Sequence, residues 1–294
     1  MFVNAIERAA EFTRAIHTIT RVWGTERIVP GSATLFFVNS DGWALTCGHV
    51  AKQIMDGDQI GIQFDAFKEE RAKIGSGKGQ KHEINQLERK YGFKHGQTVQ
   101  LHVKLLGCVD GVQNLDMVFH PTLDVALLKF QGFNKLLCDN FPVFARDGDG
   151  LKQGKSICRL GFPFPEFTNY GYDSVTDSIG WTNVGQQQTP RFPLDGIVVR
   201  HVGDTAGEII AFEVSTPGIR GQSGGPAFDV DGRVWGMQSM TKHLDLEFDI
   251  DVEVHRGTTK RRVQAGAFLH IGGCIHINAL KAFMHENNVK FQEG

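Results

Sequence analysis

The sequence lacks a strong charge of either sign and lacks any long apolar run. Its 31 Lys and Arg residues against 33 Asp and Glu residues give a formal net charge of -2 over 294 residues. Because the basic surplus typical of nucleic-acid-binding domains is missing, we expect no nucleic-acid partner. No apolar stretch reaches membrane-spanning length, so we expect no membrane partner either.

Cysteine is also scarce. The chain has five cysteines, an odd number, and no spacing among them resembles a zinc site, so we expect no metal and no other cofactor. Residues 1–16 contain two glutamates and no continuous apolar core, which makes them a poor signal peptide. Free thiols without such a signal indicate a reducing, cytoplasmic setting.

Glycine and phenylalanine are abundant instead, with 35 and 22 residues. Together with interspersed Val, Ile and Thr they are typical of many short strands joined by tight turns. A turn is predicted at 40–42, with the sequence SDG. Strands are predicted at 17–23, 32–38, 43–47, 99–105, 124–130, 156–160, 197–202, 208–214, 226–230, 233–240 and 267–277.

Helices are predicted only near the two ends and in one charged segment. Residues 1–16 carry apolar side chains at helical spacing. A second helix is expected over 278–288, with Asn278 as its N-cap. The strands between them predict an all-β fold of two antiparallel β-barrels, at 17–135 and 140–277.

Three short runs carry the functional signal. They contain His49 (TCGHV), Asp124 (DVALLK) and Ser223 (GQSGGP), in that order. A serine hydroxyl is a weak nucleophile that needs a base within hydrogen-bond reach, and the base needs an orienting partner. We therefore assign Ser223 as nucleophile, His49 as general base and Asp124 as the group that holds the histidine. The backbone N–H groups of Gly221 and Ser223 are expected to form the oxyanion hole.

These runs resemble those of the trypsin-like (chymotrypsin-fold) serine peptidases, most closely the HtrA/Deg branch. The resemblance extends to 31–51 (GSATLFFVNSDGWALTCGHVA), 154–164 (GKSICRLGFPF), 231–238 (DGRVWGMQ) and 271–283 (IGGCIHINALKAF). It implies six strands in each barrel and a single trypsin-like peptidase domain over 1–294. It also implies a serine endopeptidase that acts on protein or peptide substrates. The PDZ domain usual in that branch is not expected, because the chain ends soon after the terminal helix.

The resemblance also places a specificity pocket. Its walls would be 215–220, which includes Pro217, and the strand residues Gln238, Ser239 and Met240. Pro217 stands where trypsins carry an acid, so a basic substrate side chain would be desolvated without a partner. We therefore expect cleavage after uncharged residues, with aliphatic ones favoured.

The segment 27–31 (RIVPG) resembles a trypsin zymogen cleavage site. In trypsins the new N-terminus pairs with an acid directly before the nucleophilic serine. Here that position is Gln222, which is neutral, so we expect no activation by propeptide release.

Two segments fall outside the resemblance, 65–115 and 241–266. The charged stretch 68–98 is predicted to be an exposed loop with a short helix near 83–91 and a flexible run at 75–79. Residues 244–254 (LDLEFDIDVEV) alternate strictly, which predicts a half-buried strand. A turn at Arg256–Gly257 would set the basic residues 260–262 opposite its acids. Each segment is either a solvated surface or a recognition element, for a basic partner or cation in the case of the hairpin.

Two other functions remain open on the sequence. A peptidase fold with an intact triad can serve as a catalytically silent scaffold or binding protein. The same serine chemistry also supports an esterase or another acyl hydrolase.

Overall fold

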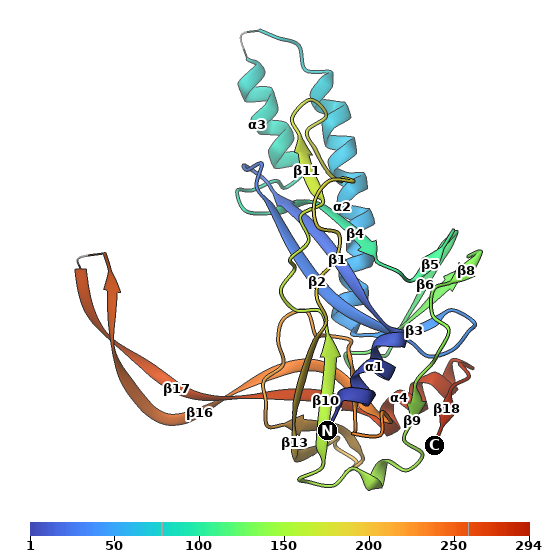
Figure 1. The fold of residues 1–294 in the computed structure, drawn as a ribbon. Helices are drawn as coiled ribbons and strands as arrows, with labels where there is room; N and C mark the ends of the chain where they lie inside the picture. Colours follow the sequence, from blue (N-terminus) through green and yellow to red (C-terminus); the bar gives the residue numbers. More distant parts are fainter. Residues whose placement is uncertain (78, 258) are drawn as a thin grey trace.

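The structure is a computed structural model that describes residues 1–294 except residues 78 and 258. Strands make up 44% of the chain and helices 20%. Two large sheets follow one another along the sequence, with long projections of helix and strand leaving the body (Figure 1). The predicted chymotrypsin-like fold is confirmed.

The N-terminal sheet has six antiparallel strands in the order β4-β1-β2-β3-β7-β6. Within the described residues its edge strands, β4 and β6, do not pair with each other, so the sheet curls into a half-barrel. The strands are β1 (Thr13–Val22), β2 (Ile28–Phe37), β3 (Trp43–Thr46), β4 (Thr98–Leu105), β6 (Asn114–Phe119) and β7 (Ala126–Gln131).

The second sheet closes on itself. Six antiparallel strands follow in the order β15-β10-β13-β14-β17-β16, and β16 pairs back onto β15. The short strands β9 and β18 extend the sheet in parallel beside β16. The strands are β9 (Val143–Phe144), β10 (Ser156–Gly161), β13 (Phe192–Gly203), β14 (Ile209–Val214), β15 (Pro226–Phe228), β16 (Val234–Arg256), β17 (Thr259–His276) and β18 (Gln292–Glu293).

The remaining elements are short ribbons and helices. They are the pair β5 (Val109–Asp110) and β8 (Lys135–Leu136), the pair β11 (Tyr170–Asp173) and β12 (Ser178–Trp181), the helices α1 (Val3–Phe12), α2 (Gly48–Ala72), α3 (Gln80–Lys90) and α4 (Ile277–Glu286), and the 3₁₀ turn η1 (Gly148–Gly150). One continuous core joins both sheets, because Phe36 of β2 packs against Phe144 of β9. No described helix is both long and apolar enough to cross a membrane.

The terminal helices are present but shorter or shifted. The prediction of a helix over 1–16 is wrong beyond Phe12, where the chain becomes β1 and pairs with β2. The β-branched residues that follow favour a strand, and Thr13 closes the helix by donating to the Ala9 carbonyl at 2.6 Å. At the other end α4 begins at Ile277, with His276 as N-cap in place of Asn278.

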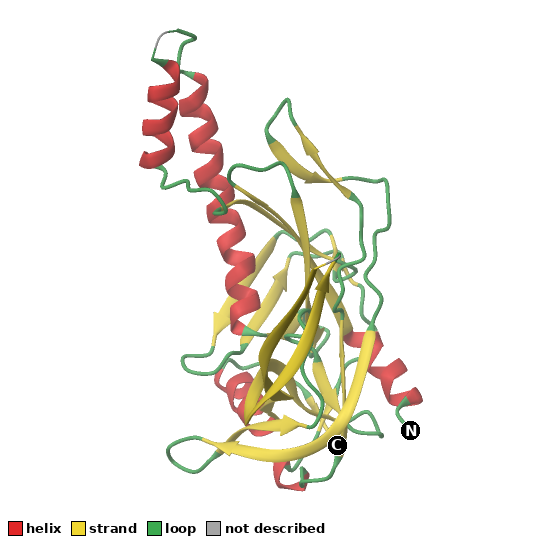
Figure 2. Cartoon of the chain, turned by 90° about the vertical axis from the view of Figure 1, so that its left-hand side faces the viewer, coloured by secondary structure: helices red, strands yellow, loops and turns green. Residues whose placement is uncertain are grey.

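The prediction of an exposed loop over 68–98 is wrong. The helix expected near 83–91 is α3, but α2 extends as far as Ala72, so the two form a helical hairpin (Figure 2). An aromatic cluster explains this: Phe64 and Phe67 of α2 pack with Phe93 and Trp23. The flexible run expected at 75–79 includes residue 78, which lies outside the described residues. Strand β4, inside the segment predicted as an insertion, belongs to the first sheet and pairs with β1.

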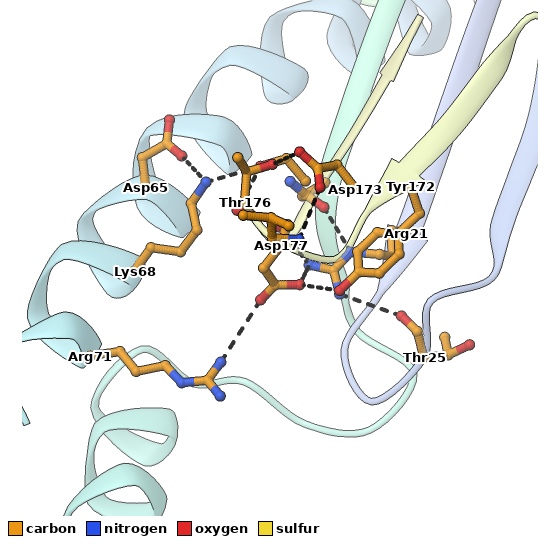
Figure 3. A network of polar contacts seen from close by, with 12 residues as sticks. Arg21, Thr25, Asp65, Lys68, Arg71, Tyr172, Asp173, Thr176 and Asp177 are labelled. Atoms are coloured by element: carbon orange, nitrogen blue, oxygen red, sulfur yellow. Dashed lines mark hydrogen bonds and ion pairs between the residues drawn. The ribbon is translucent and has the colours of Figure 1, made fainter. Parts of the chain in front are cut away.

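A polar network fastens α2 to the ribbon of β11 and β12 (Figure 3). Asp177, between these two strands, forms ion pairs with Arg21 of β1 at 3.0 Å and with Arg71 of α2 at 3.8 Å. Lys68 of α2 donates to Ser178 Oγ at 3.0 Å. Tyr172 donates to Asp177 Oδ1 at 2.8 Å. The inserted helix is therefore held by a segment from the second half of the chain.

The outer parts of β16 and β17 form a two-stranded ribbon that projects from the body (Figure 1). The predicted turn follows Arg256, although residue 258 is not described. Lys260 pairs with Glu253 at 3.2 Å, as the predicted opposition of basic and acidic groups requires. A half-buried strand would bury its whole apolar face. That expectation is wrong, because apolar side chains of β16 such as Phe248 and Ile250 remain about half exposed to solvent. Among the described residues no second layer covers the ribbon.

Candidate active site

His49 and Asp124 meet where two paired strands end. His49 is the second residue of α2, directly after β3, and Asp124 precedes β7, which pairs with β3. His49 Nδ1 lies 2.8 Å from Asp124 Oδ2, and the His49 backbone N–H donates to Asp124 Oδ1 at 2.9 Å. Because a helix N-terminus has unpaired N–H groups and a positive dipole end, the carboxylate also caps α2.

A third donor completes the surroundings of this carboxylate. Ser239 Oγ donates to Asp124 Oδ2 at 2.7 Å. Burial raises the pKa of Asp124, but the hydrogen bonds from the His49 ring, the Ser239 hydroxyl and the His49 N–H outweigh burial and lower the pKa to about 2. The carboxylate is therefore ionised above roughly pH 4, and it can hold the histidine in the tautomer with a proton on Nδ1.

Ser223 lies in a tight loop between β14 and β15. The N–H of Gln222 donates to the Ile219 carbonyl at 2.9 Å, and Gly221 within this turn has a φ of 101°. A positive φ at the third turn position is the type II arrangement, which favours glycine. A Cβ on Gly221 would also lie 2.7 Å from the Phe162 carbonyl oxygen. Both conformation and space therefore require glycine here.

The loop leaves two donors free. Among the described residues the backbone N–H groups of Gly221 and Ser223 have no hydrogen-bond acceptor. Neighbouring free N–H groups of this kind can bind the negative oxygen of a tetrahedral intermediate. Ser223 Oγ contacts the Ser239 carbonyl at 3.4 Å and makes no hydrogen bond to His49 in this arrangement.

A cavity of about 860 Å³, here called the cleft, brings these groups together. Its walls come from β1 and β2 of the first sheet, from the loop before Ser223 and from β16 of the second sheet. His49, Ser223 and Gly221 all line it. The other titratable side chain on its described walls is Arg220. A cleft between two packed units is a common position for a substrate site.

The structure places three of the four predicted pocket residues on the cleft wall. Gln238, Ser239 and Met240 line it. Pro217 does not: it is exposed outside the cleft, and its carbonyl accepts from Arg159 at 3.2 Å. Gly218, the next residue, takes its place on the wall.

Cys47 makes the centre look like a metal site, since its Sγ, His49 and Asp124 offer ligand atoms within 4.8 Å of one another. Cys47 is fully buried, and burial raises the pKa of its thiol well above the usual range. A neutral thiol that donates to the Gln238 carbonyl at 3.3 Å is a weak metal ligand. The donor set therefore fits a histidine–carboxylate pair better than a metal centre.

The surroundings of Gln222 agree with the rejection of zymogen activation. Its side chain accepts from the Ile219 N–H at 3.1 Å and donates to the Phe192 carbonyl at 3.2 Å. Ile28 is far from being a free N-terminus, because it pairs with Arg21 inside the first sheet.

Two residues near the site have roles that the sequence did not predict. Ser239 was expected only as a substrate-binding residue, whereas its hydroxyl also holds Asp124. Arg159, which lies behind the pocket, was not singled out. The sequence did contain a signal for Arg159: it is a charged residue inside the otherwise apolar strand 156–161 (SICRLG).

No curated protein sequence matches the chain. Among solved structures, the HtrA-type protease AlgW with a decapeptide is similar at 13% identity and a TM-score of 0.49, over 98% of this chain and 68% of that one. AlgW with a tripeptide gives 16% identity and a TM-score of 0.47, over 98% and 65%. A variant of AlgW with a tripeptide gives 14% and 0.47, over 99% and 64%.

The chain thus spans 64% to 68% of the length of these proteins. Residues 33–237 match the trypsin-like peptidase domain, and the matched range contains His49, Asp124 and Ser223. It covers more than half of the chain and parts of both sheets. The chain belongs to the trypsin-like peptidase domain family.

Proposed function

We propose that this chain is a serine endopeptidase that uses Ser223, His49 and Asp124 as a catalytic triad. The observation that carries the proposal is the arrangement around the cleft. Asp124 accepts hydrogen bonds from His49 and Ser239, and Gly221 and Ser223, whose N–H groups have no acceptor among the described residues, line the cleft together with His49.

The chemistry follows from these positions. His49 Nε2 takes the proton of Ser223 Oγ as that oxygen bonds to the substrate carbonyl carbon. The carbonyl oxygen becomes negative and is bound by the N–H groups of Gly221 and Ser223. The C–N bond then breaks as His49 returns the proton to the leaving amine, and water releases the acyl group by the same steps. Substrate binding brings Ser223 Oγ from the Ser239 carbonyl to His49.

The substrate would be a protein or peptide lying along β16 at Met240, with its backbone paired to the strand. We propose that basic side chains are excluded from the pocket behind this strand, since no acidic side chain lines the described cleft walls. A reducing, cytoplasmic setting is part of the proposal, because all five cysteines are buried with free thiols.

The test is Ser223→Ala, with Ser40→Ala in an exposed turn as the matched control. Peptide hydrolysis should fall below about a hundredth of the wild-type rate in Ser223→Ala and stay unchanged in the control. A fluorophosphonate should label the wild type and the control but not Ser223→Ala. A folded wild-type protein that no fluorophosphonate labels would identify a silent scaffold, and hydrolysis of simple esters alone would identify an esterase.

A further inference from the structure

Arg159 of β10 is fully buried and forms no ion pair with a described acid, although the charge of Asp195 on the neighbouring strand β13 acts on it. Its exposed fraction is 0%, and it is among the largest fully buried side chains of the chain. Nη1 donates to Gln238 Oε1 at 2.6 Å, and Nη2 donates to Thr216 Oγ1 at 2.5 Å and to the carbonyls of Thr216 and Pro217 at 3.1 and 3.2 Å. Its Nε has no acceptor. Every acceptor is a neutral oxygen, and no described carboxylate forms an ion pair with it.

The guanidinium lies at the back of the expected specificity pocket. It links the two pocket walls, because Thr216 and Pro217 lead directly into the wall residue Gly218 and Gln238 lies on the other wall. Gly272 of β17 leaves space for it: a Cβ there would lie 1.9 Å from Nη1. Thr241, which lines the cleft, is the strand partner of Gly272.

Gln238 connects this charge to the cleft. Arg159 holds its Oε1, which fixes the amide so that Nε2 lies on the side of Gly218. Nε2 donates one hydrogen to the Met240 carbonyl at 2.7 Å, and its second hydrogen has no acceptor among the described residues. An amide donor held by the arginine therefore lies beside Gly218 of the cleft wall.

A buried cation without an ion-pair partner is costly, since neutral oxygens only partly replace its lost hydration. An acidic substrate side chain in the pocket would supply the missing negative charge. A lysine or arginine side chain of the substrate would instead place a second positive charge beside Arg159. Arg220, exposed on the cleft wall, has the same sign, and no acidic group opposes it there.

We propose that Arg159, acting with Gln238, makes the pocket selective for an acidic residue, Glu or Asp, directly before the scissile bond. The proposal rests on the proposed peptidase function of the same cleft. It differs from the expectation of uncharged residues based on Pro217 alone, because that expectation took no account of a charge brought in from β10.

The experiment compares fluorogenic peptides that differ only at the residue before the cleaved bond: Glu, Asp, Gln, Leu and Lys. Peptidyl phosphonates with the same residues report the rate at which Ser223 is labelled, even where turnover is slow. For the better of Glu and Asp, kcat/KM should exceed that for Gln by roughly 10- to 100-fold, and Lys should be poorest. The preference over Gln should fade below roughly pH 4.3, where the substrate carboxylate takes up a proton.

Arg159→Met should remove the preference for an acid while Leu is still accepted. Arg159→Lys, which keeps the charge, should retain a smaller preference. Arg21→Met is the control, because Arg21 is similarly buried but its side chain bonds to Gln100, Thr25 and Asp177, none of which lines the cleft. If Arg159→Met fails to fold, the order of the wild-type kcat/KM values for the five peptides still tests the proposal.

Two outcomes would overturn the proposal in different ways. Cleavage and labelling that favour Leu or Gln over both acids would refute the role of Arg159 and leave the peptidase function intact. A wild-type protein that cleaves no peptide and reacts with neither phosphonate nor fluorophosphonate would refute the proposed function, and the specificity with it.

Discussion

Asp124 shows how one side chain can serve two parts of the fold. Its Oδ2 accepts from the His49 ring, and its Oδ1 accepts from the first turn of α2. The same negative charge therefore orients the histidine and stabilises the helix that carries it. Any change at this position should affect both activity and stability.

Asp124→Asn should lower turnover by roughly 10⁴-fold, because an amide favours the wrong tautomer of His49. It should also show a pH-dependent loss of stability. The folded pKa of about 2 lies below the ordinary value of 3.8, so the stabilisation is present above pH 3.8 and is lost as the pH falls through 2. Its full size is about 2 kcal/mol.

Urea unfolding of wild type and Asp124→Asn at pH 5 and near pH 2 measures this. The difference in unfolding free energy should shrink by up to about 2 kcal/mol at the lower pH. A difference that stays constant would show that the carboxylate gains no stabilisation from its three donors.

Local sequence predicted the reactive residues well and the supporting residues poorly. His49, Asp124 and Ser223 each lie in a short run whose pattern is tied to its role. Ser239 and Arg159 act through contacts to residues more than 70 positions away in sequence, at Asp124 and Gln238. Such contacts depend on the register of paired strands, which a single sequence does not specify.

Among the elements, the ribbon of β16 and β17 has an uneven charge distribution. Four acids on β16, at positions 245, 247, 249 and 251, have no ion-pair partner among the described residues, whereas Glu253 pairs with Lys260 and His255. At its base, Lys242 pairs with the buried Glu213 at 2.7 Å, and this anchors the ribbon two residues after Met240 of the cleft. The unpaired acids thus begin five residues after Met240 on the same strand.

Neutralising these four acids together, as Asn or Gln, should slow the cleavage of basic protein substrates and leave a small uncharged ester unaffected. The loss should be largest at low salt, because 0.1 M salt screens such charges over about 10 Å. Rates for both substrates at 20 mM and 200 mM salt provide the measurement. The matched control neutralises Lys260, Arg261 and Arg262, which should not slow basic substrates.

Equal losses on protein and ester would show that the ribbon supports the catalytic fold. Unchanged rates on both would leave the acids as a solvated surface.

For the molecule as a whole, activity should need neither trimming nor a metal. Gln222 cannot pair with a new N-terminus, and the thiol beside His49 is a weak ligand. Full-length protein of intact mass should keep its hydrolytic rate after EDTA treatment. A rate that appears only after cleavage at Arg27, or that EDTA abolishes, would contradict this.

The overall fold was predictable where apolar alternation and turns repeat, which located five strands of the first sheet and the six antiparallel strands of the second. Strand β6 was missed, and the expectation of six strands in each barrel came from the resemblance. The helical hairpin of α2 and α3 was not predictable, because its stability depends on Trp23 and Phe93 from outside the helices. The exposure of the β16–β17 ribbon was missed for a similar reason. Alternation shows that a strand has an apolar face, but it does not show whether anything covers that face.

The length of α2 limits how far this helix can tilt before His49 leaves its position in the active site. His49 lies in its first turn, and Lys68 and Arg71, near its last turn, contact the β11–β12 ribbon (Figure 3). At 1.5 Å per residue, about 28 Å of helix separates Lys68 from His49. Catalytic groups must be held to within about 0.5 Å, so a rigid rod pivoting at the ribbon can tilt by only about 1°. The position of the His49 imidazole is thus fixed partly by contacts at the opposite end of α2.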